Sequence, residues 1–465
     1  MATTREQAEA HAYANRRMST SLLRGEDEAR LDPRRRLNRA LGASLAVGVL
    51  VIAGFGIAGW LGGGRGPALP TDGAVVVGAG GDSYVVVDGV AYPALNLASA
   101  LLAGGGRLTE VRQATLDEAP RGLPVGIPGA PDALPDAGEL RDGAWTLCAT
   151  PAETGEEPVD TALYVAVPRV PTGDAEGGGA TLLVETEDDA LWLLAEGRRY
   201  AVEPGVRDLL GLPRRPVRLP SEVVATVPEG PAITVPEPEP RAGDEPSVEL
   251  PFEAVVGDVA HTDDEGVARR YFLVRPDGLA PVSELVHTLL VPEPGTDHAI
   301  SFADAAAAPR TGGEPGDPAW PEEVPEALAP ERNQPVCVST PPGSVPGDVP
   351  WRATVHLPPT MPEPEGTPPV AALDGGRLGL LDRIYLPAGS GAVVRAATSG
   401  GAGGTHTLVT DGGTAYPFAS PDAVERLGYD PDAAPSMPTA YVALLPAGPV
   451  LDPEAAAEER RGEAE

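Results

Sequence analysis

The sequence contains no lysine, so all 34 of its basic residues are arginine. Without lysine, the chain cannot form a Schiff base with a carbonyl substrate, and it cannot supply the lysine of a phosphate-binding P-loop. The GxSxG motif of serine hydrolases and the HExxH motif of zinc proteases are absent as well. We therefore predict a protein that is not an enzyme.

Aromatic residues are also scarce, at 4% of the chain, so Val, Leu and Ala must fill its cores. The 57 glycines and 54 prolines predict short strands, many turns and long irregular connections. Acidic residues outnumber basic ones, which gives a net charge of −34 at pH 7 and argues against a nucleic-acid partner. The 465 residues are enough for two to four domains.

The clearest apolar run extends over the 22 uncharged residues from Ala40 to Leu61. As a helix this run is about 33 Å long, which matches a hydrocarbon core of roughly 30 Å. It is too long for a cleaved signal peptide, so we predict a single transmembrane anchor. The positive-inside rule then predicts residues 1–39 inside and 65–465 outside, with Trp60 at the outer interface. The arginines that set this orientation are Arg34, Arg35, Arg36 and Arg39.

The segment before Pro33 is predicted to be helical, with a narrow stripe made by Ala10, Ala14, Met18 and Leu22. Such a stripe stabilises an isolated helix poorly in water. We expect Met18 and Leu22 to bind a groove on a cytoplasmic partner. The alternative is a helix that lies on anionic lipid.

The chain has only two cysteines, Cys148 and Cys337. Outside the cytoplasm they are expected to form a disulfide that closes a loop of about 190 residues, the alternative being two free buried thiols. The six histidines show no metal-ligand spacing, and the HTDDEG segment at His261–Gly266 is interpreted as a solvated turn. We therefore expect no metal ligands and no cofactor.

One pattern occurs twice, as YVVVDGVAYPALN at Tyr84–Asn96 and as HTLVTDGGTAYPFAS at His406–Ser420. Each copy has an apolar strand, an Asp-Gly turn typical of hairpins, a second strand that ends in Tyr-Pro, and a helix with a polar N-cap. Two weaker copies lie between them, so we predict four divergent hairpin-helix-strand repeats. The Asp-Gly turns are Asp88-Gly89, Asp277-Gly278 and Asp411-Gly412.

The segments around the two cysteines are predicted to be strands of a central β-rich domain, joined to the repeats by proline-rich connections. The predicted fold class is α+β, with one N-terminal transmembrane helix followed by four repeats around that central domain. The expected boundaries are a cytoplasmic segment at 1–39, a transmembrane helix at 40–61, repeats at 74–134, 179–235, 250–305 and 371–453, central-domain halves at 140–175 and 332–360, and an acidic tail at 454–465.

The chain resembles EccB, the single-span membrane component of actinobacterial type VII (ESX) secretion machines. The resemblance rests on RRMSTSLLRGE before the anchor, AYPALNLASALLAGG after the first hairpin, PRGLPVGIPGAP, and LLPAGPVLDP. It implies a structural subunit of the plasma membrane that scaffolds the complex and forms its extracytoplasmic part, with elongated outer domains. The implied partners are an EccC-like motor ATPase, EccD-like and EccE-like membrane subunits, a mycosin protease, and further copies of the chain in a hexameric complex.

Two other functions remain open at this point. EccB-like repeats look like peptidoglycan-binding modules of a phage lysin, which would place Tyr92 and Tyr416 in glycan-binding grooves; packing at a strand end is the simpler explanation for these tyrosines. Some EccB-like proteins are also described as ATPases. The lack of a P-loop and of lysine argues against ATP hydrolysis by this chain.

Overall fold

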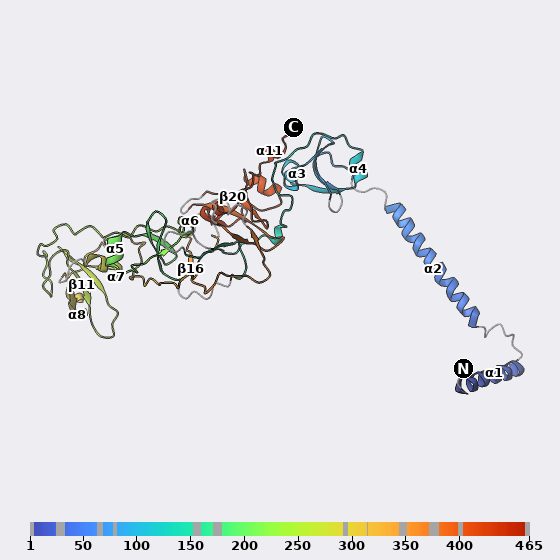
Figure 1. Cartoon of the computed structure of the whole chain (residues 1–465), viewed down its shortest axis with the longest axis horizontal. Coiled ribbons are helices and arrows are strands. Elements are labelled where there is room, and N and C mark those ends of the chain that lie inside the picture. Colours follow the sequence, from blue (N-terminus) through green and yellow to red (C-terminus); the bar gives the residue numbers. More distant parts are fainter. Residues whose placement is uncertain are drawn as a thin grey trace. The chain divides into compact units, whose positions relative to one another are not determined.

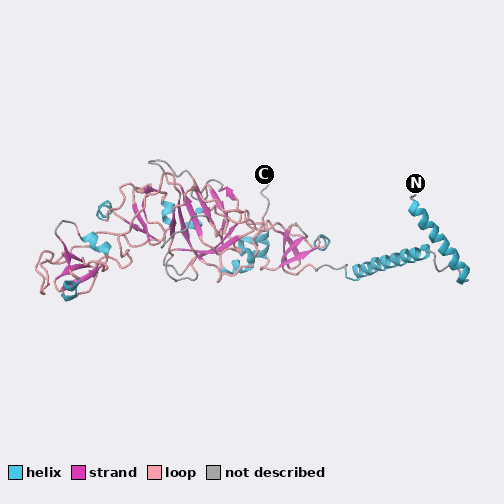
Figure 2. Cartoon of the chain, turned by 90° about the horizontal axis from the view of Figure 1, so that it is seen from below, coloured by secondary structure: helices cyan, strands magenta, loops and turns pink. Residues whose placement is uncertain are grey.

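The computed structural model describes residues 4–24, 33–62, 68–77, 81–151, 160–170, 179–291, 296–313, 315–343, 351–371, 381–398 and 403–460. The chain divides into two compact units, Met1–Ala68 and Leu69–Glu465. The described part of the first unit is built from helices, whereas strands dominate the second, as the secondary-structure colours in Figure 2 show. Each unit is described by itself below.

The first unit consists of α1 (Thr4–Arg24) and α2 (Pro33–Gly62). Pro33 is the first residue of α2 rather than the residue that ends α1, because a proline at the start of a helix has no amide that needs a partner. Among the described residues, no helix is both long enough and apolar enough to cross a membrane. The predicted span at 40–61 falls inside α2 and stays a prediction. The side chains of Leu22, Arg34, Arg35, Arg36, Arg39 and Trp60 lie outside the described part of the structure.

Within its described residues, the second unit contains four four-stranded sheets that share one strand order. In each sheet the first three strands form an antiparallel meander, and the fourth strand returns parallel to the first. Sheet 1 contains β1 (Gly73–Val77), β2 (Ser83–Val87), β3 (Val90–Pro93) and β4 (Leu108–Val111). Sheet 2 contains β7 (Leu182–Glu185), β8 (Leu191–Ala195), β9 (Arg198–Ala201) and β10 (Val217–Arg218). Sheet 3 contains β11 (Val259–Thr262), β12 (Tyr271–Arg275), β13 (Gly278–Val282) and β14 (Asp297–Ile300). Sheet 4 contains β19 (Gly391–Ala397), β20 (Thr405–Thr410), β21 (Ala415–Pro417) and β22 (Ser436–Pro438).

Short helices occupy equivalent places in these four sheets. One helix connects the third strand to the fourth, and a second helix follows the fourth strand. The connecting helices are α3 (Leu97–Ala103), α5 (Pro204–Leu209), α7 (Glu284–Leu290) and α9 (Pro421–Arg426). The following helices are α4 (Gln113–Asp117), α6 (Ser221–Ala225), α8 (Phe302–Ala307) and α10 (Thr439–Leu444). Two of the expected caps are present, since Asn96 caps α3 and Ser420 caps α9 through their side-chain oxygens.

The hairpin turns follow the sequence in some sheets and not in others. Asp88 and Gly89 both have positive φ, at 51° and 75°, as a two-residue hairpin turn of this kind requires. Asp411 and Gly412 lie in the turn between β20 and β21, as predicted, but the glycine with positive φ is Gly413, at 74°. Four residues separate β20 from β21 there, and the Asp411 carboxylate accepts a hydrogen bond from the Gly389 amide at 2.8 Å.

The sheet 3 turn also differs from the prediction. Gly278 pairs with Arg275, so the two turn residues are Pro276 and Asp277. Gly278 is instead the first residue of β13, with φ of 143°, and a Cβ there would collide with the Pro309 carbonyl. This glycine is therefore required by close approach of another backbone segment rather than by the turn itself.

The remaining six strands form a central sheet in the order β16-β15-β5-β6-β18-β17. These strands are β5 (Trp145–Ala149), β6 (Thr161–Tyr164), β15 (Val336–Thr340), β16 (Thr354–His356), β17 (Pro369–Ala371) and β18 (Arg383–Tyr385). Four of them lie where the sequence predicts central strands. However, β18 falls inside the segment expected to open the fourth repeat at 371, because it pairs in parallel with β6.

The first and last sheets share one core. Val85 and Leu102 from the sheet 1 region lie in the same buried cluster as Leu408 and Val424 from the sheet 4 region. Arg426 Nη1 donates a hydrogen bond to the Leu102 carbonyl at 2.7 Å. The two copies of the pattern that are far apart in sequence are therefore neighbours in space.

Sheets 2 and 3 form a second pair in the same way. Leu193 and Val206 from the sheet 2 region share a buried cluster with Leu273 and Leu289 from the sheet 3 region. Helices α5 and α7 contact each other in this pair, as α3 and α9 do in the first. The sheets thus pair in a nested order, first with fourth and second with third.

The C-terminal segment docks on the first sheet region. Helix α11 (Pro453–Ala456) packs against α3, with Ala456 fully buried, and the two helices are adjacent in Figure 1. Beyond it, Arg460 Nε donates to the Gly126 carbonyl at 2.9 Å. The expected acidic tail is therefore folded up to residue 460, because its small apolar residues complete the core shared by sheets 1 and 4.

Candidate functional site

A disulfide joins β15 and β5, two neighbouring strands of the central sheet. Cys148 in β5 and Cys337 in β15 are directly opposite each other in the antiparallel pairing, and their sulfur atoms are bonded. The predicted disulfide is present in the structure, and the alternative of two free thiols is wrong. Both residues are fully buried, so the bond is shielded from reductants and serves a structural role.

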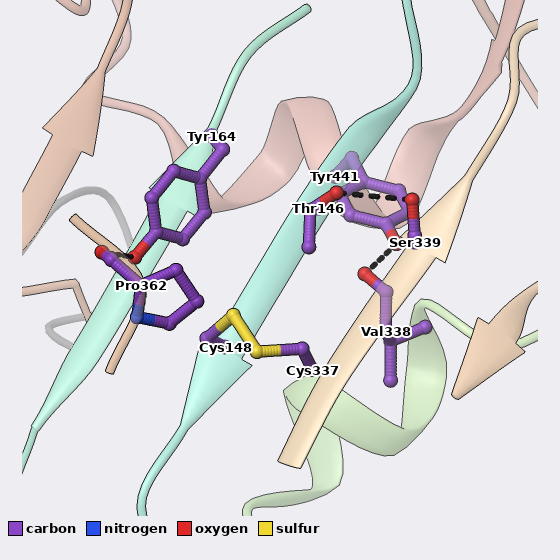
Figure 3. Close-up of a disulfide and its surroundings, with 8 residues drawn as sticks. All are labelled: Thr146, Cys148, Tyr164, Cys337, Val338, Ser339, Pro362 and Tyr441. Atoms are coloured by element: carbon purple, nitrogen blue, oxygen red, sulfur yellow. Dashed lines mark hydrogen bonds between the residues drawn. A yellow bond between two sulfur atoms is a disulfide. The ribbon is translucent and has the colours of Figure 1, made fainter. Parts of the chain in front are cut away.

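Tyr164 covers the disulfide on its side of the sheet (Figure 3). Its hydroxyl donates a hydrogen bond to the Pro362 carbonyl at 2.6 Å, and its ring stacks on Tyr385 with 4.7 Å between the ring centres. Burial raises the pKa of Tyr164 well above its ordinary value. The disulfide is therefore enclosed between the sheet and a proline-rich segment that follows β16.

Tyr441 of α10 attaches sheet 4 to the other side of the cysteine strands (Figure 3). This residue is fully buried, and its hydroxyl donates to the Val338 carbonyl at 3.0 Å and lies 3.1 Å from Thr340 Oγ1. Its ring meets Trp145 edge-on, with 6.2 Å between the ring centres. Burial raises the pKa of Tyr441, so the hydroxyl stays protonated as a hydrogen-bond donor.

The central sheet also contacts sheet 2. Leu147 and Val338 of the central sheet share one buried cluster with Val184 of β7 and Val223 of α6. Residues of sheet 4, such as Val394, belong to the same cluster. The central sheet is thus the joint between the two sheet pairs, and the disulfide lies within that joint.

The tyrosines considered for glycan binding have a packing role. Tyr92 packs on Gly122 and Tyr416 packs on Gly448, so closely that a Cβ on either glycine would overlap the ring. Tyr200 contacts Gly230 of sheet 2 in the same manner and is buried. The Tyr92 and Tyr416 rings are half-buried against their own sheets, which supports the packing explanation over a glycan-binding groove.

The glycines belong to Pro-x-Gly segments that add a short extra strand to each sheet. In sheet 1, the Ala91 amide donates to the Pro120 carbonyl at 2.8 Å, and the Gly122 amide donates back to Ala91 at 3.0 Å. In sheet 4, Ala415 pairs with Ala447 in the same pattern. The phrases PRGLPVGIPGAP and LLPAGPVLDP thus encode these edge segments.

Sheet 3 is the exception that explains the pattern. Leu279 pairs with Arg310, in the same way as Ala415 pairs with Ala447 in sheet 4. The next residue, however, is Ala280 instead of tyrosine, and the residue after Arg310 is Thr311 instead of glycine. Tyrosine and glycine are therefore lost together, as expected if the glycine exists to admit the ring. Sequence reasoning missed this pairing, although Tyr followed at a distance by Pro-x-Gly was visible in three copies.

Sheet 3 holds a cluster that linear spacing did not reveal. His261 Nδ1 and His287 Nε2 lie 2.9 Å and 3.1 Å from the same oxygen, Oδ1 of Asp297. Burial lowers the pKa of His287 below its ordinary value, despite the nearby Asp297 charge. Burial opposes ionisation of Asp297, but the hydrogen bonds and charge of the two histidines outweigh it, so the pKa of Asp297 is lowered.

Carboxylates contribute to the described groove beside Tyr271. This groove has a volume of about 630 Å³. Glu284, Glu322 and Glu323 line it together with Arg269, so three carboxylates face one guanidinium, a balance of charge that disfavours phosphate groups. At the N-terminus, the part of α1 whose side chains are described is exposed throughout, with Met18 60% accessible.

These features define a modular, disulfide-bridged β-rich protein whose fully buried polar contacts hold sheets together. The family described as "Type VII secretion system ESX-1, transport TM domain B" matches residues 1–464. The chain belongs to this family, the EccB family of type VII secretion.

Named relatives and solved structures agree with this assignment. The chain is 31% identical over 311 residues to "ESX-2 secretion system ATPase EccB2" of Mycobacterium tuberculosis, a match that covers 62% of this chain and 59% of that protein. It is 30% identical over 306 residues to "ESX-3 secretion system ATPase EccB3" of Mycolicibacterium smegmatis, covering 62% and 57%. These alignments therefore span less than two thirds of the relatives' own length.

The structural matches extend further along the chain. A chain of an intact ESX-5 inner membrane complex aligns with a TM-score of 0.65 at 25% identity, covering 100% of this chain and 97% of that one. The EccB3 dimer from the ESX-3 core complex aligns with a TM-score of 0.65 at 25% identity, covering 83% and 100%. The periplasmic assembly of the ESX-5 complex aligns with a TM-score of 0.63 at 25% identity, covering 86% and 97%.

Proposed function

We propose that this chain is a structural subunit of a type VII (ESX) protein secretion complex, which it scaffolds and whose extracytoplasmic part it helps to build. The observation that carries the proposal is the alignment of the whole chain with a component of an intact ESX-5 inner membrane complex. The buried contacts described above support it, because they stiffen a multi-sheet body. A stiff body of this kind suits a role in holding other subunits in place.

We also propose that the chain has no ATPase activity of its own, although its relatives carry that word in their names. The sequence has no lysine and no P-loop, and in the described groove beside Tyr271 three carboxylates outnumber one arginine. A motor subunit of the EccC type would supply ATP hydrolysis. The other proposed partners are EccD-like and EccE-like subunits, a mycosin protease and further copies of this chain.

The proposed topology is a single membrane pass with the N-terminus inside. It is supported by the uncharged run from Ala40 to Leu61 within α2 and by the arginines before it. The disulfide supports an oxidising location for the second unit. Protease added to intact spheroplasts should digest residues 65–465 and spare the N-terminal segment, as detected with antibodies to each end. Protection of the large domain would refute this topology.

The proposed assembly handle is α1. Its apolar stripe includes the exposed Met18, and helical periodicity places Leu22 on the same face. Such a stripe fits a groove on another subunit, where an introduced charge would be costly to bury. The lipid surface is the competing site for this helix.

Co-purification tests both the function and the handle. We expect the full chain, extracted from its native membrane in mild detergent, to bring down the motor subunit and to release no phosphate once stripped of it. Leu22→Asp should lower recovery of the motor at least about tenfold, which corresponds to a loss of roughly 1.4 kcal/mol. Mass spectrometry of the eluate measures the recovery.

The matched control is Thr20→Asp, which introduces the same charge on the opposite face of α1 from Met18 and Leu22. It should leave recovery unchanged. If Leu22→Asp retains the motor at wild-type yield, α1 is not the handle. If the wild-type chain recovers no secretion subunit at all, or hydrolyses ATP alone, the proposed function itself is wrong.

A further inference from the structure

The His–Asp cluster of sheet 3 is assembled from three separate elements. His261 comes from β11, Asp297 from β14 and His287 from α7. Asp297 lies opposite Val259 in the parallel register, so it faces the same side of the sheet as Val259 and His261. Helix α7 covers that side, because its residues Leu285 and Leu289 share a core with Val259.

The donor atoms converge on one point. Both histidine nitrogens approach Asp297 Oδ1, and the three ligand atoms all lie within 4.8 Å of one another. The two imidazole rings are nearly perpendicular, at 88°, as ligands on adjacent corners of a tetrahedron can be. Zinc–ligand bonds of about 2.0–2.1 Å separate donor atoms by about 3.3 Å in a tetrahedron. The two N···O distances, 2.9 Å and 3.1 Å, need to lengthen by only a few tenths of an ångström to reach that spacing.

The surroundings hold the histidines in place and leave one side open. The Tyr271 ring packs on His287 with 4.7 Å between ring centres, and the Tyr271 hydroxyl donates to Glu284 Oε1 at 2.8 Å. The His287 side chain is 9% exposed, that of His261 is 18% exposed and that of Asp297 is 27% exposed. The two histidine nitrogens are therefore held close to the carboxylate of Asp297, which is partly exposed to solvent.

We propose that His261, His287 and Asp297 form a binding site for a divalent transition metal, best suited to Zn²⁺, with the fourth position filled by water. Two imidazoles and one carboxylate are a donor set that zinc accepts, and three protein ligands plus water is a common zinc arrangement. Binding moves the proton of each histidine to its other ring nitrogen, which frees a lone pair for the metal. The ion would tie α7 to the first and last strands of sheet 3. This inference is independent of the secretion role.

A second histidine of sheet 3, His298, provides a control for the metal-binding test. His298 lies on the opposite face of β14, and its Nε2 is 2.8 Å from Oδ2 of Asp258, the residue before β11. Among the described residues, this His–Asp pair is not part of a three-ligand cluster. His298 is adjacent to Asp297 in sequence but faces the other side. Substitution of His298 therefore removes a neighbouring histidine without touching the proposed site.

The test is titration of the full chain in detergent with Zn²⁺ alone, after chelator treatment and with a purification tag that contains no histidine. We expect one tightly bound Zn²⁺ per chain by calorimetry, and a higher melting temperature with the metal. His261→Gln and Asp297→Asn should each weaken binding by more than about 100-fold, since loss of an outer-shell partner alone costs 10–100-fold. His298→Gln should bind as the wild type does.

A second measurement distinguishes loss of a metal ligand from a substitution that only disturbs the fold. Co²⁺ bound to the wild-type chain should show the visible absorption of a tetrahedral site with nitrogen ligands, and this band should disappear in His261→Gln. If the wild-type chain binds no Zn²⁺ at micromolar concentration, the cluster is only a hydrogen-bonded triad and the proposal fails. Binding that is equal in His261→Gln and wild type would also overturn it.

Discussion

Replacing both cysteines, Cys148→Ser with Cys337→Ser, is expected to lower the free energy of unfolding by about 2–5 kcal/mol. The disulfide spans a sequence separation of 189 residues, so its loss restores a large amount of freedom to the unfolded chain. It also removes the covalent link between β5 and β15, whose residues Leu147 and Val338 share a buried cluster with sheets 2 and 4. Urea denaturation of the full chain in detergent measures the change.

The effect should be local to the joint. Hydrogen exchange followed by mass spectrometry should show faster exchange in peptides from β5 and β15, and little change in the core formed by Leu273 and Leu289. Ser339→Ala is the matched control in the same strand; it removes one hydrogen bond to Thr146 and should cost only about 1 kcal/mol. An unfolding free energy unchanged by the double substitution would show that the disulfide contributes nothing to the joint.

Tyr441→Ala is expected to destabilise the chain by about 3–5 kcal/mol, the range for removing a large buried aromatic side chain. The substitution leaves a cavity against Trp145 and deprives Thr340 of a partner for its hydroxyl. Helix α10 should then separate from the cysteine strands at lower denaturant concentration. Hydrogen exchange in α10 and β15 reports this separation directly.

Tyr441→Phe separates packing from hydrogen bonding. It keeps the ring against Trp145 and removes only the hydroxyl, so the expected cost is about 1 kcal/mol. A loss in Tyr441→Phe as large as that in Tyr441→Ala would mean that the hydroxyl, rather than the ring, holds α10 on the sheet. A loss below about 1 kcal/mol in Tyr441→Ala would show that sheet 4 is attached elsewhere.

The buried tyrosines show how far reasoning from sequence reaches here. The pattern Tyr-Pro was recognised in two copies, and packing was the simpler explanation for its tyrosines. What the ring packs against was not predictable, because Gly122 and Gly448 lie about 30 residues beyond their tyrosines. The packing seen in three sheets, and the loss of both residues together in sheet 3, show that tyrosine and glycine belong together.

The histidine cluster was missed for a related reason. Metal-ligand spacing is recognisable when ligands share one turn of helix or one loop, where the local backbone sets the distance. His261 and Asp297 instead meet because β14 returns parallel to β11, and His287 joins them because α7 covers that face. No short sequence pattern indicates that these three residues are close together in the folded chain.

Features that depend on a few neighbouring residues can be predicted from the amino-acid sequence of this protein. Local backbone preferences and local hydrogen bonds account for three such features. They are the Asp88-Gly89 turn, the caps at Asn96 and Ser420, and the strands around Cys148 and Cys337. Three other features became known from the folded chain: which sheets pair, the place of β18 in the central sheet, and the docking of α11 on α3. Apolar faces built from the same Val, Leu and Ala residues can pack against many partners, so the choice among them depends on the shape of the whole assembled core.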